Sequence, residues 1–412
     1  MVRFNRWQLV QAATLVALAT AFAGSGSAQS PSASVDGGAG TPSSFYQWSD
    51  SVPTTAGKLL RSEPLEDRLQ LEQSARSVRF LYSSESFSGK PVAVSAAAFL
   101  PEGEAPKGGW PVIAWSHGTV GIADQCAPSW SGRSERDVSY LNYWLAKGYA
   151  IVATDYEGLG TPGPHPYLHC EAAARGNIDA VVAAQGLGWG LSKKWLVTGQ
   201  SQGGHGALCT AVQASSRAPD LEFVGTLATA PGIGFLKAYS GQHTERDGPM
   251  RYLGVVLLNV TAMETFTPTF SAETSLTEPA RALLPRVHEA CVFELLREGA
   301  ALGLTTSTTF THVPFSETPG IKDAVQHMEI PAVRLPQPIL IGQGTADTMT
   351  PVALANAYAR EHCEAGSQLT YLVYEGEEHS GPMSVGREDF SKWVEGRFRG
   401  EVSPGNCASL ER

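Results

Sequence analysis

The sequence contains no run of lysine or arginine residues that could follow a phosphate backbone. Its 30 basic and 40 acidic residues give a formal net charge of -10 at pH 7. Proteins that bind nucleic acid neutralise phosphate groups with clustered basic side chains, so we expect no nucleic-acid partner. An acidic balance favours solubility and by itself indicates no cationic substrate.

The six cysteines include no Cys-x-x-Cys pair and no metal-ligand spacing. The sequence therefore predicts neither a zinc site nor a redox site. An even number of cysteines in an exported chain favours disulfides. The spacing alone leaves the pairing open, and a buried free thiol is the alternative for Cys209, which lies in a helical pattern.

Only the N-terminal residues contain a long apolar run. Arg3 and Arg6 precede an apolar stretch from Leu9 to Ala23, and residues 26–28 are small. This pattern is typical of a secretory signal peptide over residues 1–28, because a membrane anchor needs about 20 apolar residues. We expect an exported mature chain, secreted or periplasmic, without a transmembrane segment. Removing the two arginines changes its net charge from -10 to -12.

The chain after this segment alternates strands and helices. Residues 29–44 are predicted to be a flexible leader, because they contain little to bury, and residues 45–71 an irregular segment. Buried or alternating apolar runs predict strands at residues 78–83, 91–100, 110–116, 149–154, 195–199, 223–230, 338–342 and 369–374. Helices are predicted at residues 140–147 and 172–185. This order indicates an α/β protein with a mostly parallel central sheet and helices on both faces.

The alternation stops after the strand at residues 223–230. Residues 232–326 show no clear buried strand, and helical patterns occur at residues 254–263, 278–287 and 290–298. We interpret residues 232–330 as a helical cap over the carboxyl edge of the strands. The core is then divided into residues 45–231 and 331–412. Asn259-Val260-Thr261 matches the glycosylation pattern by coincidence, since it lies inside an apolar helical run.

The residues from Leu196 to Ala207 contain the candidate nucleophile. They comprise an apolar strand, a sharp turn at Ser201 and a helix that begins with small residues, with Gly199 and Gly203 on either side. Gly-x-Ser-x-Gly between a strand and a helix is typical of a nucleophile elbow. Glycine is needed because the strand and the helix pass too close for side chains. The helix N-terminus suits an oxygen that gains negative charge.

A serine nucleophile needs a base and an acid that orients the base. In this architecture the chain order is serine, acid, histidine. Asp347 ends the loop after the strand at residues 338–342, and His379 lies in the loop after the strand at residues 369–374. Both residues therefore lie at the strand edge that carries Ser201. We assign Asp347 as the orienting acid and His379 as the general base.

Other titratable residues have simpler interpretations. His205 and His362 lie in helical patterns and are expected to be packing or surface residues. Glu377 and Glu378 are alternatives to Asp347, but their closeness to His379 in sequence indicates solvated loop charges. Asp155 precedes the serine, which breaks the chain order, so we expect it to bond N–H groups of a loop.

The oxyanion hole of this architecture uses two backbone N–H groups. One comes from the residue after the nucleophile, here Gln202, and one from the loop after an earlier strand, here His117-Gly118-Thr119. We assign Thr119 as the second donor, with Gly118 as the alternative. His117 is expected to tether the loop.

Four runs of the sequence resemble the secretory lipase family. They are Ala-Trp-Ser-His-Gly-Thr at residues 114–119, Asp-Gln-Cys-Ala-Pro-Ser at 124–129, Gly-Tyr-Ala-Ile-Val-Ala-Thr-Asp-Tyr-Glu-Gly-Leu-Gly at 148–160, and Gly-Gln-Ser-Gln-Gly-Gly at 199–204. The likeness extends from about residue 110 to the C-terminus and is weakest in the cap. It implies an α/β-hydrolase with a helical cap that acts on carboxylic esters without a cofactor, and it agrees with Ser201, Asp347 and His379.

The same resemblance implies two disulfides. One joins Cys126 to the cap, where Cys291 is the candidate, and the other joins Cys363 to Cys407. Cys170 and Cys209 remain as a pair that the family pattern supports only weakly.

These observations together predict an exported serine hydrolase of small-molecule or lipid esters. The family includes lipases and esterases, and the cap is not evenly apolar enough to indicate an interfacial lid. An acyltransferase or a peptidase could use the same three residues. A binding protein on this scaffold would be expected to lack one of them. The acyl chain and the oligomeric state are not readable from the sequence.

Overall fold

The computed structural model describes residues 40–235 and 250–410. The predicted signal peptide, most of the predicted leader and residues 236–249 of the predicted cap lie outside these ranges. The described residues belong to one compact unit.

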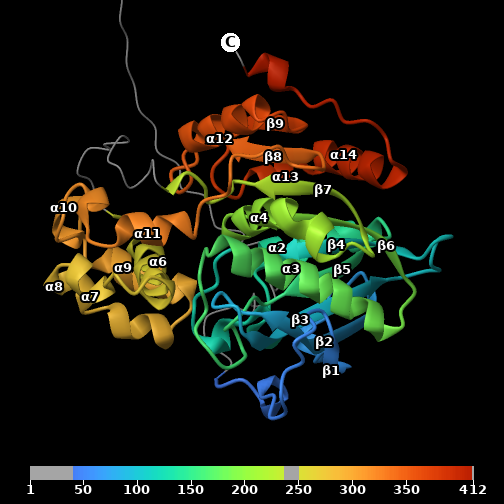
Figure 1. Ribbon diagram of the computed structural model, residues 1–412, viewed down its shortest axis with the longest axis horizontal. Helices are drawn as coiled ribbons and strands as arrows, with labels where there is room; N and C mark the ends of the chain where they lie inside the picture. The colour runs from blue at the N-terminus through green and yellow to red at the C-terminus, as the bar shows by residue number, and fades with distance from the viewer. Residues whose placement is uncertain (1–39, 236–249, 411–412) are drawn as a thin grey trace, which may run out of the picture. The chain divides into compact units, whose positions relative to one another are not determined.

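A nine-stranded sheet forms the centre of the structure (Figure 1). Its order is β1-β2-β3-β5-β4-β6-β7-β8-β9. The first three strands are antiparallel to their neighbours, and from β5 to β9 every pairing is parallel. The strands are β1 Leu59–Pro64, β2 Ser74–Glu85, β3 Pro91–Pro101, β4 Trp110–Ser116, β5 Ala150–Thr154, β6 Leu191–Gln200, β7 Glu222–Thr229, β8 Ile339–Gly344 and β9 Leu369–Tyr374.

Successive residues of the central strands face opposite sides of the sheet, because the side-chain period of a strand is two. In β4, Val112 and Ala114 belong to one apolar cluster, whereas Ile113 and Trp115 belong to the other. The first cluster contains side chains of α3 (Cys170–Ala184), α4 (Gln202–Arg217) and α12 (Val352–Glu364). The second contains side chains of α2 (Glu135–Ala146), α13 (Pro382–Val385) and α14 (Arg387–Arg399). The sheet is therefore covered by helices on both faces, as the sequence predicts.

The helices of this core are longer than the apolar patterns. They are α1 Pro128–Ser131, α2 Glu135–Ala146, α3 Cys170–Ala184, α4 Gln202–Arg217, α12 Val352–Glu364, α13 Pro382–Val385 and α14 Arg387–Arg399. Helix α2 begins earlier than the predicted residue 140, because the Ser134 side chain accepts a hydrogen bond from the N–H of Asp137 and caps the first turn.

The sequence predicts an irregular segment at residues 45–71, and this prediction is wrong in part. It contains β1, which pairs antiparallel with β2 at the edge of the sheet. The strand lacks an alternating apolar pattern because none of its side chains is fully buried. The short 3-10 helices Ser44–Tyr46 and Asp67–Leu69 flank it.

The residues between β7 and β8 form a helical insertion, which we define as residues 253–326. It supplies most of one apolar cluster, including Leu257, Met263, Leu295 and Phe310, which Ile122, Tyr167 and Leu168 of the core also join. An isolated bridge between Leu276 and Phe310 is its one β pairing among the described residues. Its helices are α6 Leu253–Phe266, α7 Ala272–Ser275, α8 Glu278–Arg281, α9 Val292–Ala301, α10 Thr306–Thr309 and α11 Ile321–Gln326.

Two predicted helices of the insertion need correction. The pattern at residues 278–287 forms α8 followed by the 3-10 helix Leu284–His288, because Pro285 lacks the N–H that a continuous helix requires. The helix predicted at residues 290–298 begins at Val292, since Cys291 is its N-cap. Asn259 is buried in α6, in agreement with the view that its glycosylation pattern is a coincidence.

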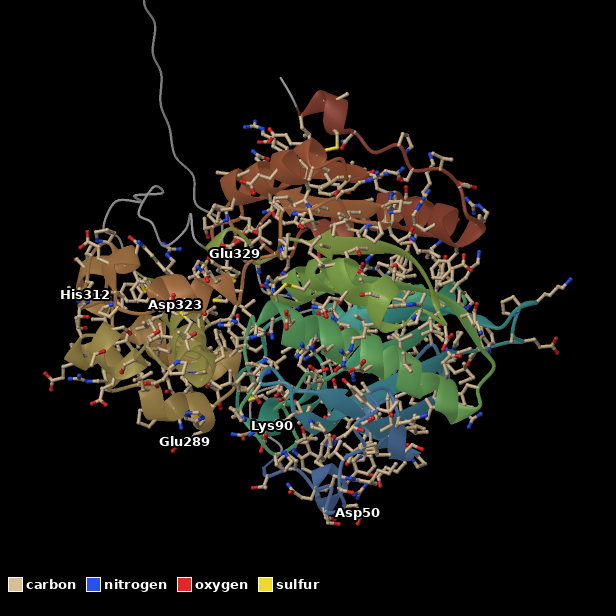
Figure 2. All side chains as sticks on the ribbon, viewed as in Figure 1. Asp50, Lys90, Glu289, His312, Asp323 and Glu329 are labelled. Atoms are coloured by element: carbon tan, nitrogen blue, oxygen red, sulfur yellow. A yellow bond between two sulfur atoms is a disulfide. The ribbon has the colours of Figure 1, made fainter. Side chains whose placement is uncertain are left out.

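Several links join the insertion to the core. A disulfide connects Cys126 to Cys291, and the N–H of Val292 donates to the Val120 carbonyl at 2.8 Å. Figure 2 shows Glu289, His312 and Asp323 on the insertion and Asp50 and Lys90 on the core.

The other four cysteines are paired as well. Cys363 is bonded to Cys407, as the resemblance implies, and Cys170 to Cys209. The alternative of a free thiol at Cys209 is therefore wrong. No helix in the described ranges has the length and apolar character needed to cross a membrane.

Candidate active site

Ser201 lies on the sharp turn between β6 and α4. Its backbone has φ 58° and ψ -119°, a conformation that a residue with a side chain rarely adopts. The turn is held by three hydrogen bonds. The Ser201 N–H donates to the Thr229 carbonyl at 3.0 Å, and the Ser201 carbonyl accepts from the N–H groups of His205 at 3.0 Å and Gly232 at 3.2 Å. Such strain persists where the surrounding structure fixes it, which is common at functional sites.

The two glycines beside Ser201 allow this turn. A Cβ atom on Gly203 would overlap the carbonyl oxygen of Ser116 in β4, and a Cβ atom on Gly199 would overlap the carbonyl oxygen of Gly203. Any side chain at either position would therefore push the elbow helix away from the sheet.

Asp347 and His379 form a hydrogen-bonded pair. The Nδ1 atom of His379 lies 2.8 Å from Oδ2 of Asp347. Asp347 follows β8 and His379 follows β9, two neighbouring parallel strands, so their exit loops meet at one edge of the sheet. The expected proximity of these two residues is thus present.

The Asp347 carboxylate accepts further hydrogen bonds from its own loop. The N–H groups of Met349 and Thr350 donate to Oδ1, both at 2.9 Å, and the Thr350 hydroxyl donates to Oδ2 at 2.7 Å. Burial raises the pKa of Asp347, but the bond to His379 and those from Thr350 outweigh it and leave the pKa below its usual value. The group is therefore an anion at neutral pH.

The loop of His379 is tied to the elbow strand. Gln200, which precedes Ser201, donates from Nε2 to the His379 carbonyl at 3.2 Å. Arg136 of α2 donates to the Ser380 hydroxyl at 3.0 Å. Within the described residues, Nε2 of His379 is buried without a partner, and no hydrogen bond joins it to Ser201 Oγ. Such bonds are often long in a free enzyme and tighten when substrate binds.

The two assigned oxyanion donors come from separate loops. Gln202 is the first residue of α4, and Thr119 follows β4. In the part of the chain that the structure describes, no hydrogen bond uses the N–H of Gln202, Gly118 or Thr119. These groups are consistent with a role as donors to a substrate oxygen, while the Thr119 hydroxyl is bonded to the Tyr167 hydroxyl at 2.6 Å.

The alternative residues occupy other environments. Among the described residues, neither Glu377 nor Glu378 makes an ion pair with His379. His205 and His362 are buried packing residues. Asp155 is buried and accepts the N–H of Ser129 at 2.9 Å, which fits its expected structural role.

His117 makes the expected tethering contacts. Its Nδ1 lies 2.7 Å from the Gly118 carbonyl, and its Nε2 lies 3.3 Å from the Asp155 carbonyl. The contact with Asp155 links the loop after β4 to the end of β5.

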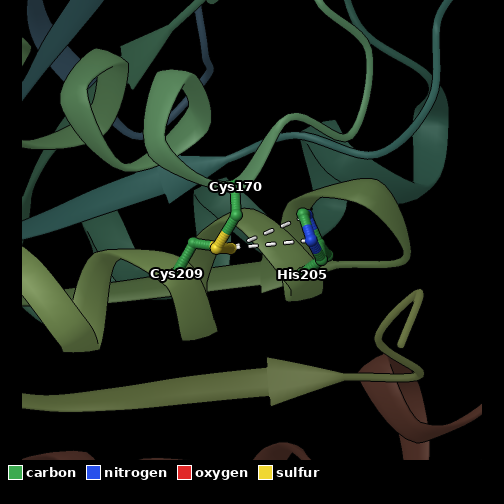
Figure 3. A group of neighbouring side chains, drawn as sticks. All are labelled: Cys170, His205 and Cys209. Carbon is green, nitrogen blue, oxygen red and sulfur yellow. Dashed lines mark hydrogen bonds between the residues drawn. A yellow bond between two sulfur atoms is a disulfide. The ribbon is translucent and has the colours of Figure 1, made fainter. Parts of the chain in front are cut away.

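Cys170, His205 and Cys209 form one cluster of potential metal ligands, whose ligand atoms lie within 4.8 Å of one another (Figure 3). Both sulfur atoms are committed to the disulfide between α3 and α4. His205 Nε2 lies 2.7 Å from the Met328 carbonyl, to which it donates. The cluster is therefore a structural link from the elbow helix to α3 and to the segment just after the insertion.

The sequence predicts no role for three residues near the site, Gln200, Tyr156 and His165, although the first two lie in runs that resemble the family. Gln202 donates from its side chain to Nε2 of His165 at 3.1 Å. The one sequence signal for a role of Gln200 is its position immediately before Ser201. Tyr156 and His165 act through contacts between distant parts of the chain.

Glu157 is a buried carboxyl group close to these residues. Its side chain is 7% exposed, and Oε2 accepts the N–H of Phe87 at 2.9 Å. Burial raises the pKa of Glu157 from 4.5 to about 7, against the lowering effects of the Phe87 bond and Arg175. The folded protein thus holds a proton that the unfolded chain releases between these pH values.

We expect Glu157→Gln to become progressively more stable than the wild type as the pH rises. The stability linked to the Glu157 proton is complete below pH 4.5 and is lost as the pH increases through about 7. A glutamine keeps the acceptor for Phe87 but carries no charge. The free energy of unfolding of the variant, relative to wild type, should rise by about 3 kcal/mol between pH 4.5 and pH 8.

Urea unfolding at these two pH values measures this difference. Glu104→Gln, at an exposed glutamate, is the control and should show no comparable change. A difference for Glu157→Gln that is flat or falls with pH would contradict the expectation.

The chain is similar to one known protein family and to several solved structures. The family model of the secretory lipases matches residues 133–406. No curated protein is a significant sequence match. The structure of Candida antarctica lipase A in its closed state is similar, with a TM-score of 0.72 and 18% identity, over 88% of this chain and 86% of that chain.

Two further solved structures share the fold. A candidate hydrolase of Legionella pneumophila has a TM-score of 0.71 and 20% identity, over 84% of this chain and 99% of that chain. The rice cell wall degrading esterase LipA from Xanthomonas oryzae has a TM-score of 0.64 and 21% identity, over 82% of this chain and 96% of that chain. The predicted α/β-hydrolase fold class is confirmed.

Proposed function

Because the chain belongs to the secretory lipase family, and is therefore a carboxylic ester hydrolase, we propose that it works through Ser201, His379 and Asp347 and an acyl-enzyme intermediate. The observation that carries the proposal is the juxtaposition of two features at the carboxyl edge of the sheet. Ser201 lies on a strained turn at the start of α4, and an ionised Asp347 bonds Nδ1 of His379.

The hydrogen bond to Asp347 determines which ring nitrogen of His379 carries the proton. The Asp347 carboxylate only accepts hydrogen bonds, so the neutral imidazole carries its proton on Nδ1 and leaves the Nε2 lone pair unprotonated. Nε2 takes the proton of Ser201 as its hydroxyl oxygen attacks the ester carbonyl carbon, and the carbonyl oxygen becomes an oxyanion. The N–H groups of Gln202 and Thr119 stabilise that oxyanion.

The tetrahedral intermediate then breaks down to the acyl-enzyme, and water hydrolyses the acyl-enzyme. The imidazolium of His379 gives its proton to the alcohol oxygen as the bond between that oxygen and the acyl carbon breaks. Water, deprotonated by His379, next attacks the acyl carbon of the Ser201 ester. The bond from that carbon to the Ser201 oxygen then breaks, His379 returns the proton to the Ser201 oxygen, and the acid is released. Asp347 remains ionised throughout and stabilises the imidazolium.

We also propose that the protein is exported. Three disulfides tie together elements far apart in the sequence, which is typical of proteins that fold in an oxidising compartment. The signal-peptide pattern of residues 1–28 also supports export.

Hydrolysis of a p-nitrophenyl ester series from acetate to palmitate tests the function. We expect turnover that is abolished by a serine-directed phosphonate. A maximum at long chains identifies a lipase, and activity confined to short acyl groups identifies an esterase. Absence of turnover across the series, or turnover that the phosphonate leaves intact, would contradict the proposal.

A further inference from the structure

We infer that Tyr156 and His165 are positioning residues of the oxyanion hole. They connect the loop that carries Thr119 to the elbow that carries Gln202, and so fix the spacing of the two N–H donors. The inference rests on the proposed function, because it assumes that Thr119 and Gln202 supply the two N–H donors.

Tyr156 holds the first loop. It follows Asp155 at the end of β5 and has φ 70°, a strained value for a tyrosine. Its hydroxyl donates to the His117 carbonyl at 2.9 Å and lies 2.8 Å from Ser116 Oγ. Since the hydroxyl has one proton, which goes to the carbonyl, Ser116 donates to Tyr156. The ring is therefore tied at two points to the residues just before Gly118.

His165 holds the second donor residue. Its Nδ1 lies 2.7 Å from the Glu157 carbonyl, which only accepts, so Nδ1 carries the proton. In the neutral ring Nε2 is then an acceptor, and the side-chain Nε2 of Gln202 donates a hydrogen bond to it at 3.1 Å. Burial lowers the pKa of His165 to about 3, so the ring is neutral at ordinary pH.

The two rings form one unit. Tyr156 and His165 stack with centroids 5.9 Å apart and planes 16° apart, and Tyr156 also contacts the His117 ring at 4.4 Å. Both side chains are buried. Movement of Gln202 relative to the loop at Gly118 would disturb this stack or break one of its hydrogen bonds.

A positioning role differs from simple packing in its kinetic effect. The Gln202 N–H stabilises charge that exists only in the transition state, so its displacement lowers kcat and leaves KM nearly unchanged. Loss of packing alone lowers stability without this selective effect.

Two substitutions of His165 separate its two hydrogen bonds. Asparagine places an amide nitrogen near the position of Nδ1 and keeps the bond to Glu157, but provides no acceptor for Gln202. Glutamine reaches the position of Nε2 and provides that acceptor. We expect His165→Asn to lower kcat about 10- to 100-fold, with KM within twofold, and His165→Gln to recover most of that loss.

The second readout is inhibition by a short alkyl boronic acid, whose tetrahedral serine adduct places an oxygen in the hole. Its inhibition constant should rise in His165→Asn by the same factor by which kcat/KM falls. His362→Asn is the matched control, because His362 is also buried and its ring also packs against a tyrosine, Tyr358, with centroids 4.1 Å apart. It should lower thermal stability and leave both kinetic quantities unchanged.

The outcomes are distinct. Equal kinetic effects of His165→Asn and His362→Asn, or a change confined to KM, would overturn the positioning role. If Ser201→Ala abolishes turnover and His165→Asn retains wild-type kcat, the positioning role alone fails. If Ser201→Ala keeps its activity, the proposed function itself fails.

Discussion

Replacement of Ser201 by alanine is expected to lower the kcat of ester hydrolysis by a factor of about 10⁴ to 10⁶. The variant retains His379, Asp347 and the oxyanion donors, but has no oxygen to form the acyl-enzyme. It should remain folded, since alanine tolerates the elbow backbone no worse than serine and the turn is held by backbone hydrogen bonds. Initial rates on p-nitrophenyl butyrate, with circular dichroism of both proteins, provide the measurement.

Ser216→Ala is the control for this variant. Ser216 lies on the same helix, α4, and is exposed. It should retain wild-type activity. Turnover by folded Ser201→Ala within tenfold of the wild type would remove Ser201 from the mechanism.

Replacement of Asp347 by asparagine is expected to lower kcat by about 10⁴-fold. The amide oxygen can still accept the N–H groups of Met349 and Thr350, so the loop should keep its shape. The amide nitrogen would face Nδ1 of His379 in place of Oδ2. Two donors cannot share that contact, so the imidazole moves its proton to Nε2 and cannot accept the proton of Ser201.

Glu377→Gln and Glu378→Gln are the matched controls, because both acids lie in the loop of His379. Each should retain kcat within about twofold, as expected for a charge without a direct bond to the base. Loss of activity in either control, together with retained activity in Asp347→Asn, would transfer the role of orienting acid to that glutamate.

The core of this fold could be predicted from local sequence because its signals are local. Strand β4 is a continuous apolar run, and the turn at Ser201 requires the glycines that flank it. Chain order then brings Asp347 and His379 to the edge of the sheet where Ser201 lies.

Other parts of the fold depend on contacts that a local pattern does not encode. Strand β1 exists because β2 offers an edge to pair with, although its own residues are half-exposed. The short helices of the insertion are set by packing around Leu257 and Met263 and by breaks such as Pro285.

The supporting residues of the site were hidden for the same reason. The contact of Gln202 with His165 joins residues 37 positions apart, and Tyr156 contacts His117 across 39 positions. Histidine and tyrosine at these places look like ordinary loop residues until the fold brings their partners together.

Active-site labelling tests the central assignment most directly. The wild-type enzyme is treated with a fluorophosphonate, digested, and mapped by tandem mass spectrometry, with Ser201→Ala treated in parallel. We predict one adduct, on the hydroxyl oxygen of Ser201, and none on the variant. An inactivating adduct on any other residue, or labelling of Ser201→Ala to the same extent, would contradict the account.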